Sequence, residues 1–284
     1  MKRTAAVLAV ALAWVVTSAS AQTLRTLSSA RQLHGETSLI VEVHYAVGQL
    51  KLEPASPGDL YRMELRYDED KFTPVREYDA DAGVLRLGLR TLHGNTSIRR
   101  GHGEETPSLD VALTPEVPLT LRVEVGAAES DVEFGGLQLR RVAYKTGASE
   151  SHVHFSRPNP VECDALTFEA GAAEFTATGL GNSNCRRMGF HGGVGDVTLD
   201  FGGQWRSSAD VTVKIGIGEL KLLLPRDLGV AINLSRFLTS FDRSGFTKRG
   251  GVYYSDNYAS ASYRLTLNID AAFGGIDVQW VDGR

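Results

Sequence analysis

The segment Val-Thr-Val-Lys-Ile-Gly-Ile-Gly-Glu-Leu-Lys-Leu-Leu-Leu, residues 211–224, contains the pattern that decides the fold. Apolar side chains alternate with other residues before Gly216, an acidic residue follows three positions after that glycine, and a second alternating run begins at Leu220. Residues at a period of two lie on one side of a β-strand. The segment therefore predicts two short strands that are joined at a glycine, each with one buried side.

The same unit recurs along the chain from about residue 121 onward. Its glycines are spaced by 21, 24, 22 and 23 residues and are Gly126, Gly147, Gly171, Gly193 and Gly216. The acidic partners, each three positions later, are Glu129, Glu150, Glu174, Asp196 and Glu219. One unit cannot bury its apolar side alone, so neighbouring units must stack in parallel. We therefore predict an all-β fold, a single-stranded β-solenoid with coils of about 22 residues.

The N-terminal part of the chain is less regular but also alternates like β-strands. We expect residues 22–110 to form a diverged β part that begins and caps the same stack, because terminal repeats are commonly atypical. Within it, the run 48–52 (GQLKL) echoes the run 218–222 (GELKL). The polar, glycine-rich stretch 90–107 predicts a loop and a boundary between the two parts.

The regular coils are expected over residues 111–284, interrupted by an insertion near residues 227–264 and completed by a last coil that starts at Leu267. The insertion is rich in aromatic residues, which could form a binding surface for a carbohydrate or a peptide. These residues are Phe237, Phe241, Phe246, Tyr253, Tyr254 and Tyr258. The alternative, that the insertion folds back to cover the open end of the stack, is favoured because exposed edge strands need protection.

The N-terminus predicts export. Lys2 and Arg3 precede the apolar run 5–16, and Ala19-Ser20-Ala21 offers the small residues of a cleavage site. We expect a signal peptide over residues 1–21, cleaved after Ala21, and hence a periplasmic or secreted protein. Since no other apolar run is long enough to cross a bilayer as a helix, the mature chain is expected to lack a transmembrane segment.

The charge of the mature chain argues against nucleic acid as a partner. The full chain has 30 basic and 34 acidic residues, so removal of Lys2 and Arg3 leaves 28 against 34 and a formal charge of −6. The sequence also lacks the basic block that contacts with phosphate groups require.

The two cysteines support the repeat. Cys163 and Cys185 each lie eight residues before a repeat glycine, and their separation of 22 residues equals one coil. Stacked coils would place the two Cα atoms about 5 Å apart, which is within the usual range for a disulfide. An even number of cysteines in an exported chain fits an oxidising compartment. We predict a disulfide between Cys163 and Cys185.

Candidate chemistry is sparse. The column of acidic partners could bind calcium, but solvated carboxylates that fan outward are the favoured interpretation, because exposed charge costs little. His152 and His154 should point to the same side of a strand and could ligate a metal. A third ligand is not evident, although His191 in another coil could approach them. Since no catalytic motif occurs, we predict no catalytic residues, no metal and no cofactor.

Two stretches resemble known families. Residues 60–68 (LYRMELRYD), followed by Pro74, are similar to the N-terminal part of the toast-rack proteins. Residues 216–230 (GIGELKLLLPRDLGV) resemble the putative-adhesin β-solenoid family and the C-terminal domain of LiaF-type cell-wall-antibiotic response proteins, as do residues 254–258 (YSDNY) and 273–278 (FGGIDV). The resemblance covers most of residues 40–280 and implies stacked, toast-rack-like coils. It implies no catalytic residues.

These observations favour a non-enzymatic, exported β-solenoid with a structural or binding, adhesin-like role in the bacterial cell envelope. Its partner would be an envelope polymer or an envelope protein. A soluble accessory or regulator of the envelope stress response, as the LiaF-type proteins suggest, is the first alternative. A β-helical enzyme that acts on polysaccharides is the second, and it would need long loops that gather acidic and basic residues on one side.

Overall fold

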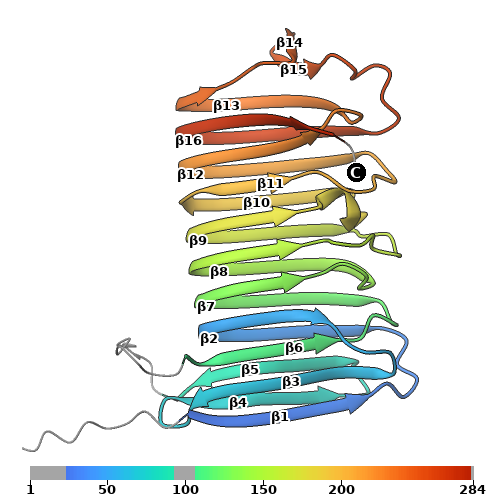
Figure 1. Ribbon diagram of the computed structural model, residues 1–284, viewed down its shortest axis with the longest axis vertical. Coiled ribbons are helices and arrows are strands. Elements are labelled where there is room, and N and C mark those ends of the chain that lie inside the picture. The colour runs from blue at the N-terminus through green and yellow to red at the C-terminus, as the bar shows by residue number, and fades with distance from the viewer. Residues whose placement is uncertain (1–23, 93–105, 283–284) are drawn as a thin grey trace, which may run out of the picture.

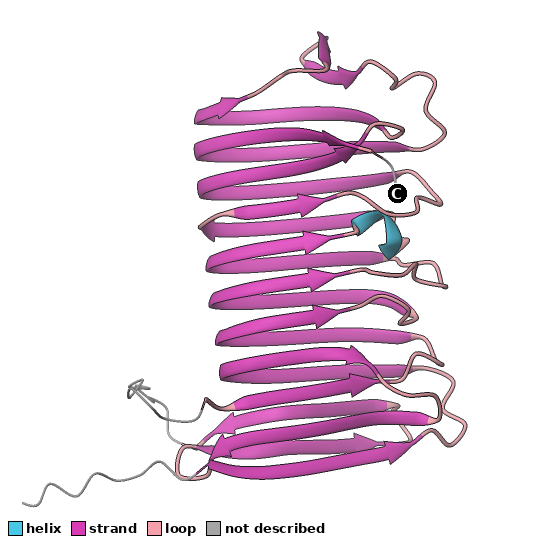
Figure 2. Ribbon diagram, viewed as in Figure 1, coloured by secondary structure: helices cyan, strands magenta, loops and turns pink. Residues whose placement is uncertain are grey.

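A computed structural model describes residues 24–92 and 106–282 of the chain; the expected signal peptide and most of the expected loop at 90–107 lie outside these ranges. The described residues form a tall column of stacked strands, with one short helical turn (Figures 1 and 2). The elements are β1 (Leu24–Gln32), β2 (Leu39–Pro54), β3 (Asp59–Asp68), β4 (Phe72–Asp79), β5 (Val84–Thr91), β6 (Ser108–Leu113), β7 (Leu119–Glu133), β8 (Leu139–His154), β9 (Ala165–Thr178), η1 (Leu180–Ser183), β10 (Arg187–Val194), β11 (Val197–Asp200), β12 (Ala209–Pro225), β13 (Gly229–Phe241), β14 (Phe246–Arg249), β15 (Val252–Ser255) and β16 (Arg264–Val281).

Each long strand makes one coil and bends sharply near its middle. In β12 the buried positions are odd-numbered up to Ile215 and even-numbered from Leu220 to Leu224, so the alternation changes phase across the bend. The bends of the full coils lie along one edge of the column, on the left in Figure 1, and the loops that join successive coils lie along the opposite edge. The halves before and after the bend thus form the two flat faces of the column, and one hydrophobic core lies between them.

The bend explains the repeated glycines. A Cβ atom on Gly216 would lie 2.5 Å from the carbonyl oxygen of Gly193 in the preceding coil. Gly218 has a φ of 141°, which side chains other than that of glycine rarely allow. Glycine is therefore required here by the close approach of neighbouring backbones.

The predicted stack of parallel coils is confirmed. Val194 pairs with Ala172 on one side and with Ile217 on the other, so that Gly193 lies between Gly171 and Gly216. The last coil also has the expected register, since β16 pairs with β12 in parallel from end to end. Aromatic rings fill the middle of the core, with centroid separations of 5.0 Å for Phe168–Phe175 and 5.1 Å for Phe175–Phe190.

At the N-terminal end, β2 forms a full coil that lies against β7, although four strands separate the two in sequence. The echo between residues 48–52 and 218–222 reflects equivalent places in the stack, because Gly48 pairs with Ala128 at the bend. Below β2, β5 and β6 make the next coil in two pieces. The antiparallel strands β1, β3 and β4 then cover this end of the core.

At the C-terminal end, the segment expected as an insertion contains a further coil. β13 pairs in parallel with β16 over residues 229–241, and the β14–β15 hairpin lies beyond it, with Ala231 opposite Tyr254. The sequence concealed this coil because its apolar alternation is confined to a short run around Val230 and Ile232.

Within the described ranges, no helix is both long and apolar enough to cross a membrane.

Candidate functional site

The face formed by the halves after the bend is dominated by carboxylates, and we call it the acidic face. It comprises the outward side chains of the second halves of β2, β7, β8, β12 and β16, the second part of β9, all of β6 and β11, and Asp196 directly before β11. Its cationic or titratable basic side chains are few: Lys51, His152, His154 and Lys221. Its carboxylates are Glu53, Asp110, Glu129, Asp131, Glu133, Glu150, Glu174, Asp196, Asp200, Glu219 and Asp277.

The column of acidic partners runs along this face beside the bends. Glu150 lies opposite Glu174, and Gln49 lies opposite Glu129 and donates a hydrogen bond to it at 3.4 Å. The side chains are exposed, and no group of three or more His, Cys, Asp or Glu residues within the described ranges could hold a metal ion. The carboxylates therefore lie side by side in solvent without converging on one point.

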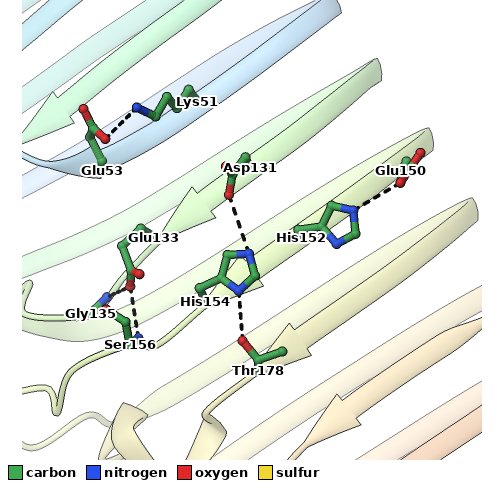
Figure 3. Close-up of polar contacts among 10 residues, drawn as sticks. All are labelled: Lys51, Glu53, Asp131, Glu133, Gly135, Glu150, His152, His154, Ser156 and Thr178. Carbon is green, nitrogen blue, oxygen red and sulfur yellow. Dashed lines mark hydrogen bonds and ion pairs between the residues drawn. The ribbon is translucent and has the colours of Figure 1, made fainter.

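Two histidines stand among these carboxylates in the middle of the column (Figure 3). The rings of His152 and His154 are parallel, with centroids 6.4 Å apart. His152 Nε2 lies 3.2 Å from Glu150, and His154 lies 3.6 Å from Asp131 through Nε2 and 2.9 Å from the Thr178 hydroxyl through Nδ1. His154 thus links Asp131 and Thr178 of the two neighbouring strands, whereas His152 contacts Glu150 of its own strand.

His191 does not complete a metal site with them. It precedes the bend of its coil and lies between Glu169 and Lys214 on the opposite face. The suggestion that His191 could approach His152 and His154 is therefore wrong, because the core separates the two faces.

The crowding of negative charge is visible in individual pKa values. Burial, and then repulsion by Glu64, raise the pKa of Asp110. The hydrogen bond from Lys51 to Glu53, at 2.8 Å, raises the pKa of Lys51. The Glu133 carboxylate accepts hydrogen bonds from the backbone N–H groups of Gly135 and Ser156, and so fixes the loop edge of this face (Figure 3).

The opposite face, formed by the halves before the bend, has balanced charge, and we call it the balanced face. In its column nearest the bend, acidic side chains have basic neighbours, with His44 3.3 Å from Glu124 and Lys145 3.7 Å from Glu169. Glu42, one column further out, pairs with arginines from two neighbouring strands. Cross-strand pairs of acidic and basic side chains are thus frequent here, whereas among the described residues of the acidic face such a pair is formed by His154 and Asp131.

The expected disulfide is present. Cys163 and Cys185 are bonded, with their Cα atoms 4.3 Å apart, and they also form a parallel β-bridge between consecutive coils. Both lie buried on the loop edge, where the bond joins the loops that follow β8 and β9.

The six aromatic residues of the expected binding surface fall into three separate groups. Phe241 packs against Phe246 and Tyr253, and the ring centroid of Phe246 lies 5.2 Å from that of Trp280; all four are partly or fully buried where the hairpin meets β13 and β16. Tyr254 and Tyr258 form a second, half-buried pair with centroids 4.9 Å apart. Phe237 stands apart at the bend of β13, exposed, with its ring edge-on to Phe273.

Comparison with known families places this architecture. The profile of the N-terminal domain of toast_rack, DUF2154, matches residues 18–176 and 160–223. The chain belongs to this toast-rack family. The match extends from the capped N-terminal end of the toast-rack chain to β12 and includes the disulfide-bonded coils.

Three solved structures resemble the toast-rack chain over most of its length. A putative cell adhesion protein from Clostridium sporogenes ATCC 15579 is 17% identical, with a TM-score of 0.47 and coverage of 91% of this chain and 100% of that one. A putative adhesin from Bacteroides fragilis NCTC 9343 is 12% identical, with a TM-score of 0.35 and coverage of 89% of this chain and 97% of that one. A putative lipid binding protein from Parabacteroides distasonis ATCC 8503 is 12% identical, with a TM-score of 0.26 and coverage of 90% of this chain and 96% of that one. The search of curated proteins gave no match.

Proposed function

We propose that this toast-rack protein is a non-enzymatic, adhesin-like binding module of the bacterial cell envelope, and that it binds an envelope polymer or protein across the acidic face. The single observation that supports this proposal most directly is the repetition of outward carboxylates from coil to coil. Adjacent strands lie about 4.8 Å apart, so such columns present one charge at regular intervals along the axis. A partner with repeated cationic or hydrogen-bond-donating groups would meet several of them at once.

The state of the carboxylates supports this proposal. Glu174 and Glu219 are exposed and make no ion pair with any described residue, so their charge is available to a partner. On the balanced face, Glu169 is already paired with Lys145. Charge complementarity of this kind mainly governs specificity and the rate of association, and it weakens as salt screens it.

The proposed location is outside the cytoplasm, in the periplasm or secreted. The disulfide supports it, because such bonds persist in oxidising compartments and are rare in the cytosol. The bond also stiffens the column at its middle, which would help a long face to remain flat enough for repeated contacts.

The test is a pull-down of envelope fractions and purified envelope glycans with the chain from Gln22 onward. We expect retention of one component at low salt, and at least about a tenfold loss of affinity in the double variant Glu150→Gln/Glu174→Gln. The matched control is Glu124→Gln/Glu169→Gln, which removes the same charge from the balanced face of neighbouring coils. Equal binding by both variants would refute the acidic face as the binding surface.

A parallel measurement with calcium and with a chelator separates two roles for the carboxylates. Retention that is unchanged by the chelator is expected if the carboxylates bind the partner directly. Loss of retention in the chelator would instead assign them to a cation that bridges the protein and its partner.

A further inference from the structure

One edge of the column carries a run of exposed apolar side chains that the acidic face does not include. Val194 lies opposite Ile217, Ile217 opposite Phe273, and Phe273 opposite Leu238, so these four form one column beside the bends. Their exposed fractions are 54%, 51%, 44% and 65%, and that of the adjacent Phe237 is 72%. We call these five residues the apolar edge.

The apolar edge is confined to the C-terminal end of the column. The equivalent positions in earlier coils hold Val47, Ala127, Ala148 and Ala172, which are small or half-buried. Side chains therefore become large and exposed only in the last four coils. A contiguous patch of large exposed apolar groups on a well-packed protein marks a surface that contacts another molecule.

A shallow hollow of about 550 Å³ lies beside this edge, over the glycine bends. Its lining includes Phe237, Gly216 and Ala272, together with the charged residues Lys214, Arg236 and Asp270. Lys214 makes no ion pair with any described residue, and Arg236 donates one hydrogen bond, to the carbonyl oxygen of Thr239 at 2.9 Å. Apolar groups and available cations thus adjoin each other.

The outermost coil and the start of the hairpin are locally cationic. Residues 229–252 contain Arg236, Arg243, Lys248 and Arg249 against Asp242 alone, a net charge of +3, whereas the whole chain carries −4. The acidic column also stops short of it. Glu219 is followed in register by Gly275 and then Ser240, so the last two coils present the apolar edge without carboxylates in that column.

We propose that this corner docks onto the surface of an anionic lipid bilayer, with Phe237, Leu238 and Phe273 entering the interface and Lys214 and Arg236 lying among the lipid headgroups. Exposed apolar groups surrounded by cations are the combination that binds such surfaces, because apolar burial and attraction to anionic lipid add together. The inference concerns a different surface from the proposed function and does not depend on it.

Two other occupants fit the corner less well. In a symmetric end-to-end dimer, the cationic segment 236–249 would lie against its own copy, and like charges would repel. A soluble acidic glycan would be held by the cations, but it would leave several large aliphatic side chains of the edge exposed. A bilayer satisfies both the charge and the apolar area.

The test is vesicle flotation with the chain from Gln22 onward, which omits the apolar run 5–16 because that run would bind vesicles by itself. Vesicles of phosphatidylcholine alone are compared with an equimolar mixture of phosphatidylcholine and phosphatidylglycerol. We expect flotation with the mixture that weakens with salt, at least about a tenfold lower partition coefficient for Phe237→Ser/Leu238→Ser, and a smaller loss for Lys214→Gln/Arg236→Gln.

Ile40→Ser is the matched control, because Ile40 is an exposed apolar residue at the other end of the column and its loss should leave flotation unchanged. All the substituted residues are exposed, and thermal unfolding checks that each variant is folded. Absence of flotation with anionic vesicles, or equal flotation by Phe237→Ser/Leu238→Ser, would overturn the proposal. Two further results would overturn it if vesicles are not bound: retention on an acidic polysaccharide, or formation of a dimer, that Phe237→Ser/Leu238→Ser abolishes.

Discussion

The two edges of the column hold neighbouring coils together by opposite means. At the bend edge, backbones meet directly because glycine leaves no side chain between them, as at Gly216 and Gly193. At the loop edge, side chains join the coils, through the Cys163–Cys185 bond and through Asn159, which bonds to Leu139 at the start of β8 and to Ser183 of η1. A repeat can thus be kept in register either by removing side chains or by adding specific ones, and the two edges should respond differently to substitution.

The largest effect is expected at the bend edge. Gly218→Ala would force an alanine to a φ of 141° and direct its Cβ into the carbonyl oxygen of Gly195, so we expect a loss of about 3 kcal/mol or more of unfolding free energy. Gly189→Ala is the control, since its Cβ would meet nothing nearer than 3.7 Å. Denaturant unfolding of both variants measures the difference, and similar midpoints would show that the bend tolerates a side chain.

Loss of the disulfide should follow closely. Cys163→Ser opens a 22-residue ring, which corresponds to about 3 kcal/mol of constraint on the unfolded chain. The measurement is the thermal midpoint with and without reductant. Reductant should lower the midpoint of the wild-type protein and leave that of the variant unchanged, and two thiols that react freely in the native protein would contradict the prediction.

Removal of the asparagine contacts should cost less. Asn159 is buried, and its amide nitrogen donates to the carbonyl oxygens of Leu139 at 2.7 Å and Ser183 at 2.9 Å, so Asn159→Ala should destabilise the fold by about 2 kcal/mol. Asn233→Ala removes one exposed amide contact, to Asn268, and should change stability by less than about 0.5 kcal/mol. Equal effects of the two variants would show that the loop edge does not depend on Asn159.

The smallest change in stability is expected from a buried hydroxyl pair near the bend of β8. There, the hydroxyl oxygen of Tyr144 lies 3.1 Å from that of Ser151. Burial raises the pKa of Tyr144, so the protein releases this proton at a higher pH than the unfolded chain does. The contribution of Tyr144 to the free energy of unfolding is therefore fully present below about pH 10 and declines as the pH rises above this value. Tyr144→Phe should lose about 1 kcal/mol at pH 7 and show a shallower alkaline decline; parallel pH curves would contradict this.

The bend edge could be predicted from the sequence, whereas much of the remaining fold could not. Glycines and acidic residues at fixed spacing predict the coils, their register and the partner of Cys163, because local geometry alone demands them. The antiparallel cover of β1, β3 and β4 depends on which strands meet over long separations, and no local pattern records that choice. The extra coil at β13 lacked a repeat glycine, since Phe237 stands where Gly216 stands two coils below.

The candidate surfaces were found in part. The column from Glu129 to Glu219 follows from the repeat, but the breadth of the acidic face does not. Asp131 and Glu133, two and four positions beyond Glu129, were the available signal, and the changed alternation after the bend places them on the same side. The position of His191 on the opposite face follows from the same phase change.

The order of the strands has a consequence for how such a protein can change its length. The last described strand, β16, is inserted between β12 and β13, so it is an internal strand of the column. A truncation that removes residues 264–282 would therefore not shorten the column by its outermost coil. It would remove an internal one and separate β13 from the coil on which it rests. Coils can be gained or lost by simple duplication or deletion only between β7 and β12, where succession in the sequence and succession in space coincide.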